Sequence, residues 1–248
     1  MLWELTNACN LTCVHCLTSS GRRDPRELDT LECQQVIDQL QRMRVRRVDI
    51  GGGEPTMRPD FWELLDYAVG HQVGVSFATN GVKISNRTAR QLAAAEDIAI
   101  QISLDGATAE VNDAVRGHGS YAMALNAMRS LAQACFANVT ISVVLTRHNI
   151  PQLDAFKRLA DTYGARLRLT ELRPAGRGAD TWQQLHPTDD QQRGLPELLK
   201  GAARAAYRID PVGDIYADNV LAGNVRNEGG LENAVNWAEC SPCAQIPG

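Results

Sequence analysis

The chain has 248 residues, of which 44% are hydrophobic and 22% are charged, a composition typical of a globular protein with one large domain or a domain plus an appendage. Its formal net charge of −4 leaves no broad cationic face, which argues against a protein that binds nucleic acid or a membrane surface. No apolar stretch approaches the roughly 20 residues of a membrane span, and no export signal is recognisable, so we expect a cytoplasmic protein with no membrane or nucleic-acid partner.

Short β-branched or apolar runs alternate along the chain with longer amphipathic stretches. The expected strands are Leu2–Thr6, Arg47–Ile50, Val73–Ala78, Ile98–Ser103, Thr140–Leu145 and Leu167–Thr170. The expected helices are Leu31–Met43, Phe61–Val69, Asn86–Ala95, Tyr121–Cys135 and Gln152–Tyr163. Three polar residues at helix starts are predicted N-caps: Thr30, Ser85 and Ser120.

These repeats predict an α/β fold, because strands joined by crossover helices form right-handed parallel units. About six units are too few for a complete eight-stranded barrel, and they suit a partial (β/α)6 TIM-like barrel. On pattern alone, an open flavodoxin-like sheet is the alternative. In both architectures, ligands gather at the carboxyl ends of the strands.

Small and polar residues follow the predicted strands at these carboxyl ends. The six endings are a cysteine-rich loop, GGGEP (Gly51–Pro55), TNG (Thr79–Gly81), SLDG (Ser103–Gly106), TRH (Thr146–His148) and ELRP (Glu171–Pro174). One such ending would be an ordinary loop, whereas their recurrence at one edge favours a functional site.

The cysteine-rich loop carries Cys9, Cys13 and Cys16, three of the seven cysteines in the chain. In a reducing compartment, cysteines so grouped indicate metal or redox chemistry rather than a disulfide framework. A structural zinc ion would need a fourth ligand, such as His15 or a distant cysteine. A four-iron cluster on three cysteines would instead leave one iron open to a ligand. Three packed, unligated thiols are the remaining alternative.

The spacing C-x3-C-x-Φ-C, with His15 at the Φ position, resembles the signature of the radical S-adenosylmethionine (SAM) enzymes. GGGEP resembles the glycine-rich motif of that family, whose backbone meets the amino group of SAM. The resemblance implies a [4Fe-4S] cluster on Cys9, Cys13 and Cys16, which would be the catalytic and metal-ligating residues. It also implies reductive cleavage of SAM and hydrogen abstraction from a substrate. The residues it places at SAM are His15, Gly52, Gly53, Glu54, Pro55, Thr79, Asn80, Ser103, Asp105, Arg116 and Leu145.

Several residues at the strand ends also have simpler interpretations. Asp105 suits a turn before a glycine, Arg116 a surface ion pair, and Leu145 the core of the barrel. Trp182 could line a substrate channel, although core packing is the safer prediction. Beyond the sixth strand, two arginines could pair with a carboxylate of the substrate, namely Arg173 and Arg177.

Longer stretches are similar to one peptide-modifying branch of this family, the mycofactocin maturases, which carry a SPASM extension. They include WELTNACNLTCVHCLTSSGRRDPRELDT, VDIGGGEPTMRPDFWELLDYA, QISLDGATAEVNDAVRG and LRPAGRGADTWQQLHPT. The resemblance implies a small precursor peptide whose C-terminal tyrosine is oxidatively decarboxylated and then joined to the preceding valine by a carbon–carbon bond. It also implies a peptide-binding chaperone and an electron donor such as flavodoxin or ferredoxin.

The C-terminal part departs from this family. We expect a radical SAM partial barrel over residues 1–185 and an incomplete, shortened SPASM-like extension over residues 186–248. SPASM extensions bind auxiliary clusters through many cysteines, yet this part has only Cys240 and Cys243. These two are candidate metal ligands for an auxiliary Fe–S cluster, with a residual loop of thiols as the alternative.

Two other functions fit the same motifs. Another SPASM-type modifier, such as a sulfatase maturase or a thioether-forming peptide cyclase, would share the barrel motifs. A non-catalytic iron–sulfur or zinc protein, used for structure or sensing, would share only the thiols.

Overall fold

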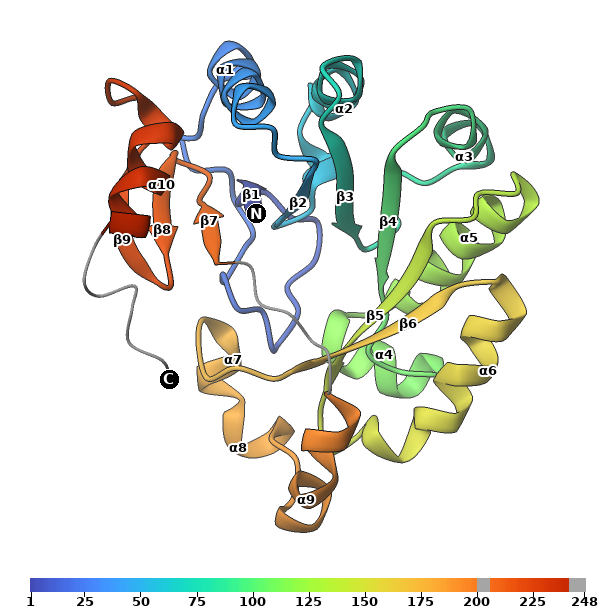
Figure 1. The fold of residues 1–248 in the computed structure, drawn as a ribbon. Helices are drawn as coiled ribbons and strands as arrows, with labels where there is room; N and C mark the ends of the chain where they lie inside the picture. The colour runs from blue at the N-terminus through green and yellow to red at the C-terminus, as the bar shows by residue number, and fades with distance from the viewer. Residues whose placement is uncertain (200–205, 241–248) are drawn as a thin grey trace. The chain divides into compact units, whose positions relative to one another are not determined.

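A computed structural model describes residues 1–199 and 206–240, and in it strands and helices alternate as the sequence predicts (Figure 1). All six predicted strands and all five predicted helices are present, with ends that differ from the prediction by at most two residues. Neighbouring strands of the repeats pair in parallel, which confirms the α/β class. None of the described helices is long and apolar enough to span a membrane.

The described residues form two compact units, and the first comprises Met1–Ala8, Arg22–Phe77 and the described part of Arg204–Gly248. Its elements are β1 (Leu2–Thr6), α1 (Thr30–Arg42), β2 (Arg47–Gly52), the short 3-10 helix η1 (Pro55–Met57), α2 (Phe61–Gly70), β3 (Gly74–Thr79, of which the last two residues belong to the second unit), β7 (Tyr207–Ile209), β8 (Asp214–Ala217), β9 (Val220–Asn224) and α10 (Gly230–Cys240). The cysteine-rich loop leaves this unit after Ala8 and returns to it at Arg22.

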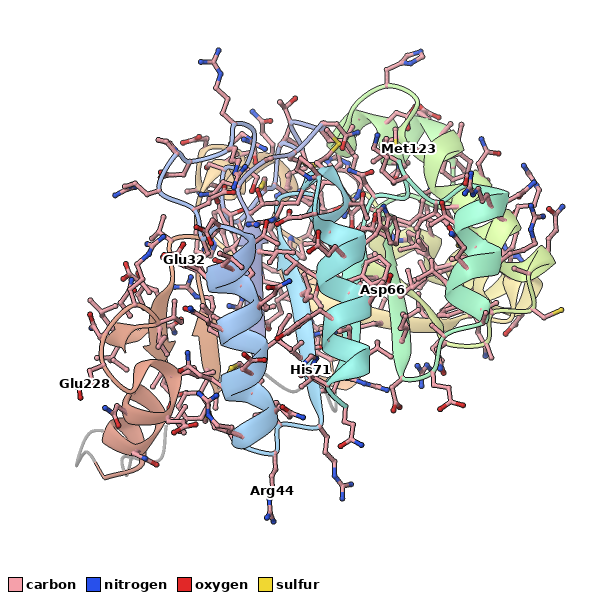
Figure 2. The ribbon with its side chains drawn as sticks, turned by 90° about the horizontal axis from the view of Figure 1, so that it is seen from above. Glu32, Arg44, Asp66, His71, Met123 and Glu228 are labelled. Atoms are coloured by element: carbon pink, nitrogen blue, oxygen red, sulfur yellow. The ribbon has the colours of Figure 1, made fainter. Side chains whose placement is uncertain are left out.

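Within the first unit the strand order is β3-β2-β1-β7-β8-β9. The pairs from β3 to β7 are parallel, and those from β7 to β9 are antiparallel. Helices α1 and α2 lie side by side, and Figure 2 shows Glu32 near the start of α1 and Arg44 just beyond its end. Trp3 and Leu5 on β1 are each 1% exposed, so β1 is anchored in the core immediately before the cysteine-rich loop.

The second unit comprises Cys9–Gly21 and the described part of Ala78–Ala203. Its elements are α3 (Asn86–Ala93), β4 (Ile98–Ser103), α4 (Ala109–Arg116), α5 (Ser120–Gln133), β5 (Val139–Leu145), the 3-10 helix η2 (Ile150–Gln152), α6 (Leu153–Tyr163), β6 (Arg166–Glu171), α7 (Arg177–Asp180), α8 (Trp182–Leu185) and α9 (Asp189–Leu198). Strands β4, β5 and β6 pair in parallel in that order. Every second residue of β5 is buried, beginning with Val139, which fixes one face of this strand in the core.

Two of the three predicted helix N-caps differ from those in the structure. Ser85 does cap α3, because its side chain accepts a hydrogen bond from the amide of Thr88. The other two predicted caps are wrong by one residue. Asp29 caps α1 in a reciprocal pair with Glu32, and Thr30 is the first helical residue. Gly119 precedes α5 with a φ of 81°, a left-handed conformation that glycine adopts readily, so Ser120 also lies inside its helix.

The sequence patterns do not predict helix α4, nor the later elements β7–β9 and α7–α10. Helix α4 is only eight residues long, and one of its buried positions is the polar Asn112. The side chain of Asn112 accepts a hydrogen bond from the amide of Asp105 and donates one to Ser120. A buried amide interrupts the apolar periodicity by which helices are recognised. The predicted domain division after residue 185 stays a prediction.

Candidate functional site

The three cysteines of the CxxxCxxC loop lie between β1 and α1, and all three are thiols rather than disulfides. Cys13 is buried, whereas Cys9 and Cys16 are half-buried. Burial raises the pKa of the Cys13 thiol, although the nearby Arg116 opposes this shift. Burial acts in the same direction on Cys16, but hydrogen bonds with the Thr18 side chain and with backbone amides outweigh it and lower the pKa of Cys16.

A segment distant in sequence holds the backbone of this cysteine loop. Arg177 of α7 donates one hydrogen bond to the carbonyl of Cys13 and another to that of Ser20, each 2.9 Å long. The Thr181 hydroxyl donates to the carbonyl of Val14. A Cβ atom on Gly176 would lie 2.4 Å from the carbonyl oxygen of Cys16, so a residue with a side chain does not fit at this position.

The sequence pattern does not indicate this contact of Arg177 with the cysteine loop. Arg177 is predicted as a partner for a substrate carboxylate, whereas in the structure two of its donor groups bind carbonyls of the loop. The available signal was the pair of glycines that flank it, since closely spaced glycines indicate a close backbone approach. The half-buried Trp182 packs against the small buried cluster of Val115, Leu172 and Leu185, as expected for a packing role.

A buried ion-pair network connects the loop with β4 and α4. The Nε2 atom of His15 lies 2.5 Å from Oδ2 of Asp105, and Nε of Arg116 lies 2.6 Å from the same oxygen. The other carboxylate oxygen accepts a 2.7 Å hydrogen bond from the amide of Val144. The side chain of Asp105 is completely buried. Burial alone would raise the pKa of this carboxyl, but Arg116 and His15 hold it well below its usual range.

The contacts of Asp105 and Arg116 in this network differ from those that the sequence suggests. Asp105 is enclosed by protein groups, so it acts on its surroundings through His15 and Arg116. Arg116 forms an ion pair as the sequence allowed, but a buried one rather than a surface one. The Nδ1 atom of His15 is buried and has no hydrogen-bond partner among the described residues. A buried, unpartnered ring nitrogen is costly unless a ligand contacts it.

The glycine-rich turn after β2 packs against the last residues before Cys9. The amides of Gly53 and Glu54 donate to the carbonyls of Thr6 and Ala8, over 2.7 and 2.8 Å. A Cβ atom on Gly53 would lie 2.2 Å from the Ala8 oxygen, and Gly52 has a φ of 108°. Both positions therefore require glycine. The buried Glu54 side chain accepts hydrogen bonds from the amide and the hydroxyl of Thr56, and Pro55 starts η1.

The remaining predicted cofactor residues lie at the expected strand ends. Thr79 at the end of β3 is buried, and its hydroxyl accepts a hydrogen bond from Gly81. Asn80 donates to Asn10 of the cysteine loop over 2.9 Å. Ser103 is the half-buried last residue of β4, and Leu145 ends β5 with no exposed surface. Their roles toward a cofactor stay predictions.

The two C-terminal cysteines cannot be placed in the site. Cys240 is the last residue of α10, and its side chain lies outside the described part of the chain. Cys243 lies outside the described residues altogether. Ligation of an auxiliary cluster by this pair stays a prediction.

The donor set of the cysteine loop fits a four-iron cluster. Three thiols on one loop supply three iron ligands, and each would bind a different iron atom. Within residues 1–199 and 206–240, no three His, Cys, Asp or Glu side chains converge as ligands of one metal ion. The buried Nδ1 of His15, which has no partner among the described residues, is a polar group of the kind that contacts a bound cofactor.

Comparison with known proteins identifies the class. Residues 3–160 match the Radical SAM superfamily, so the chain belongs to that superfamily and is an enzyme. Its cofactors are a [4Fe-4S] cluster and SAM. A curated protein of Mycobacterium ulcerans (strain Agy99), "Mycofactocin maturase MftC", is 55% identical over 268 aligned positions, which cover 94% of this chain and 73% of the relative. Within the superfamily, the chain therefore belongs to the mycofactocin maturases.

Solved structures support the fold. SuiB of Streptococcus suis bound to SAM superposes with a TM-score of 0.72 at 16% identity, over 86% of this chain and 58% of that one. SuiB bound to its precursor peptide SuiA superposes with a TM-score of 0.70 at 16% identity, over 95% of this chain and 63% of that one. At this identity the likeness shows the fold alone.

The alignment with the mycobacterial relative is longer than the part of this chain that it covers. It extends over 268 positions although it takes up only 94% of a 248-residue chain. The relative therefore has residues inside the aligned region for which this chain has no counterpart. Where these residues lie along the chain is not given by the alignment length, so the shortened C-terminal extension stays a prediction.

Proposed function

We propose that this enzyme modifies a small ribosomally made precursor peptide in mycofactocin biosynthesis. The observation that carries the proposal is the 55% identity, over 94% of the chain, to a relative named as a mycofactocin maturase. A protein of the same fold, SuiB, is described in complex with its own precursor peptide, so this architecture can accommodate such a substrate.

The reaction that we propose has two parts. The C-terminal tyrosine of the peptide loses its carboxyl group as carbon dioxide in an oxidative step, and a carbon–carbon bond to the neighbouring valine then forms. When bound, the reduced cluster and SAM supply the one-electron chemistry that removes a hydrogen atom from the peptide. The protein binds and orients the peptide and excludes water from the site.

We assign Cys9, Cys13 and Cys16 as the cluster ligands. Arg177, whose hydrogen bonds reach the carbonyls of Cys13 and Ser20, keeps the loop in one conformation. A loop held in this way presents its thiols without the cost of ordering the backbone when the cluster binds.

The glycine-rich turn and the strand ends are proposed to hold SAM. The amides of Gly53 and Glu54 donate hydrogen bonds to the carbonyls of Thr6 and Ala8, so the groups that the turn can offer to SAM are its carbonyl oxygens. Carbonyl oxygens accept hydrogen bonds from an ammonium group such as that of SAM. The buried Nδ1 of His15 is a candidate contact for the same ligand. Further candidate contacts are Gly52, Pro55, Thr79, Asn80, Ser103, Arg116 and Leu145. Asp105 serves as a positioning residue behind His15 and Arg116.

Two protein partners complete the proposal. A small peptide-binding chaperone would present the precursor, and a flavodoxin or ferredoxin would supply the electron. An auxiliary cluster on Cys240 and Cys243 is proposed as a further electron carrier, in the part of the chain where the family pattern is shortened.

The product of the reaction tests this function. Reconstituted, reduced enzyme is incubated under anaerobic conditions with SAM, the chaperone and a precursor peptide that ends in Val-Tyr, and the peptide is analysed by mass spectrometry. A peptide that has lost its carboxyl group supports the proposal. A thioether crosslink, or oxidation of a cysteine or serine, would assign the enzyme to another class of peptide or protein modifiers.

A further inference from the structure

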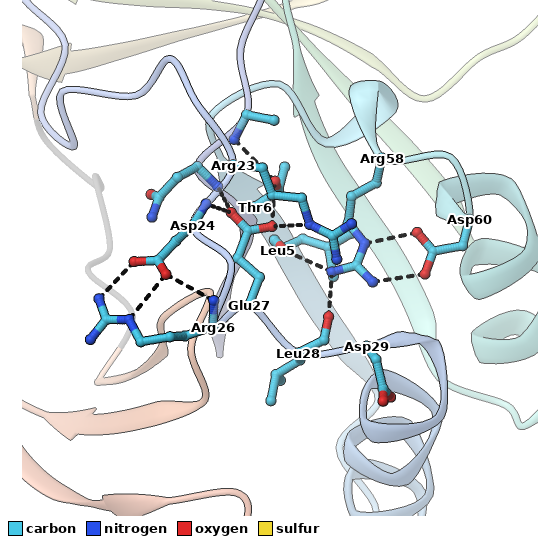
Figure 3. Close-up of polar contacts among 12 residues, drawn as sticks. Leu5, Thr6, Arg23, Asp24, Arg26, Glu27, Leu28, Asp29, Arg58 and Asp60 are labelled. Carbon is cyan, nitrogen blue, oxygen red and sulfur yellow. Dashed lines mark hydrogen bonds and ion pairs between the residues drawn. The ribbon is translucent and has the colours of Figure 1, made fainter.

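Glu27, which follows the cysteine loop and precedes α1, has a completely buried carboxylate that receives four hydrogen bonds (Figure 3). The donors are the hydroxyl of Thr6 at 2.8 Å, the amide of Asn7 at 2.7 Å, the Nε of Arg23 at 3.1 Å and the amide of Asp24 at 3.1 Å. Both carboxylate oxygens take part, each accepting two of these bonds. An ionised carboxylate is the one common side chain that accepts this many bonds without a donor of its own.

The positions of these donors along the chain are informative. Thr6 and Asn7 are the residues by which the chain enters the cysteine loop, and Arg23 and Asp24 are those by which it returns. The carboxylate of Glu27 therefore links the two ends of the loop through hydrogen bonds. The two ends of the loop are also joined by a backbone hydrogen bond of 3.0 Å from the amide of Cys9, the first of the three cysteines, to the carbonyl of Gly21.

The connection extends to the first cysteine ligand. The Thr6 hydroxyl, which donates to Glu27, also accepts a 3.0 Å hydrogen bond from the amide of Ala8. Ala8 is joined covalently to Cys9, and its carbonyl receives the amide of Glu54 in the glycine-rich turn. A displacement of Thr6 would therefore also displace Ala8 and, through it, Cys9, the first cysteine of the C-x3-C-x2-C motif.

A general stabilising role explains these contacts less well. The ion pair with Arg23 is weak as a source of stability, because the Arg23 side chain is 49% exposed. The other three donors are neutral groups, and all four lie within three residues of a loop end. Arg58 holds the same end of β1 independently, through the carbonyls of Leu5 and Leu28, so the unit retains an anchor there when Glu27 is changed (Figure 3).

We propose that Glu27 is a positioning residue that sets the spacing of the base of the cysteine loop and thereby keeps the cluster bound. The inference rests on the proposal that Cys9, Cys13 and Cys16 are the cluster ligands, and it is independent of the peptide substrate. Glu27 does not touch the cluster or SAM. It acts through Thr6 and Asn7 on one side and through Arg23 and Asp24 on the other.

The test compares Glu27→Gln and Glu27→Ala with a matched control, Glu32→Gln. Glu32 is also an arginine-paired carboxylate, bonded to Arg226, but it does not contact the loop. In each apoprotein, hydrogen exchange of the amides of Asn7 and Asp24 and the unfolding midpoint are measured. In each reconstituted protein, the iron content, the rate of cluster loss to a chelator and the spectrum of the reduced cluster with and without SAM are recorded.

We expect the amide hydrogens of Asn7 and Asp24 to exchange about tenfold faster or more in Glu27→Ala. In this variant the two amides have lost their hydrogen bonds to the carboxylate, which the wild type must break before exchange occurs. Cluster loss should accelerate by a similar factor, with Glu27→Gln intermediate because its amide oxygen still accepts bonds. Glu32→Gln should match the wild type in both measurements. If Glu27→Ala does not fold, Glu27→Gln decides the question.

Two results would overturn the proposal. The first is a folded Glu27 variant with wild-type cluster retention and wild-type spectra. The second is a loss of cluster that Glu32→Gln reproduces at an equal unfolding midpoint. A wild-type protein that binds no cluster, or a Cys13→Ala variant that keeps one, would instead refute the ligand assignment on which the inference rests.

Discussion

The carboxylate of Asp105 lies 2.5 Å from Nε2 of His15, although 90 residues separate the two in sequence. The same carboxylate pairs with Arg116, whose side chain is 11% exposed. Asp105 thus joins a residue between two of the proposed cluster ligands to the end of α4. Its enclosure by protein groups makes it a support for the site rather than a contact of the cofactor.

Replacing Asp105 by Asn should destabilise the apoprotein by about 3 to 5 kcal/mol, because it leaves the buried guanidinium of Arg116 without its counter-charge. Urea unfolding of the wild type and the variant measures this difference. The double variant Asp105→Asn/Arg116→Gln should lose less than the sum of the two single changes, since removing both charges leaves neither one buried alone. Strictly additive effects would show that the two side chains do not interact.

Replacing Gly53 by Ala should distort the turn after β2, because the new Cβ would lie 2.2 Å from the Ala8 carbonyl oxygen. We expect a loss of about 1 to 3 kcal/mol in unfolding free energy, together with weaker SAM binding by the reconstituted enzyme. Gly70→Ala is the matched control, since nothing lies within 4 Å of its new Cβ. Equal SAM affinities for both variants would argue against a cofactor role for the turn.

Replacing Cys13 by Ala should abolish stable cluster binding and the cleavage of SAM, because two thiols cannot hold the cluster at three of its corners. Cys135→Ala serves as the control, since Cys135 is exposed and lies beyond the end of α5. Iron and sulfide analysis and 5′-deoxyadenosine formation provide the readouts. Full iron content in Cys13→Ala would refute its assignment as a ligand.

The pH dependence of stability should reveal the ion pair of the buried Arg58 with the half-buried Asp60. Burial alone would raise the pKa of Asp60, but hydrogen bonds from Arg58 and Thr30 lower it from 3.8 to about 2. A depressed folded-state pKa stabilises the protein above the unfolded-state value, and this stability is lost as the pH falls toward 2. The shift corresponds to roughly 2 kcal/mol.

We therefore expect the wild type to exceed Asp60→Asn in unfolding free energy by a constant amount near neutral pH. The excess should shrink as the pH falls below about 4. Unfolding curves of both proteins at pH 7, 5, 4 and 3 measure it. An excess that does not change between pH 5 and pH 3 would contradict the assigned pKa.

Sequence patterns predicted strands β1–β6 and helices α1, α2, α3, α5 and α6 to within two residues, because their side chains alternate between buried and exposed positions at regular periods. They also located the cysteine loop and the glycine-rich turn, whose chemistry is local in sequence. They did not predict the later elements β7–β9 and α7–α10. They missed α4, where a core position is filled by the polar Asn112. They placed the cap of α1 on Thr30, because Thr30 and Asp29 are both good capping residues and only the backbone geometry distinguishes them.

The supporting contacts of the site were beyond prediction for a different reason. The bonds from Arg177 to the cysteine loop, and that between His15 and Asp105, join residues 90 or more positions apart. Such pairings depend on how the elements come together, which periodicity does not encode. Glu27 lies close in sequence to Arg23 and Asp24 but 20 or more positions from Thr6 and Asn7, so only the folded chain shows that its carboxylate meets both ends of the loop.

The most direct test of the central claim follows hydrogen from the peptide to the cofactor. Reduced, reconstituted enzyme is supplied with SAM, the chaperone and a precursor peptide whose C-terminal valine and tyrosine carry deuterium on carbon, and the 5′-deoxyadenosine is analysed by mass spectrometry. A radical SAM peptide maturase should give 5′-deoxyadenosine that has gained deuterium, in proportion to the decarboxylated peptide. Unlabelled 5′-deoxyadenosine together with an unchanged peptide would contradict the claim.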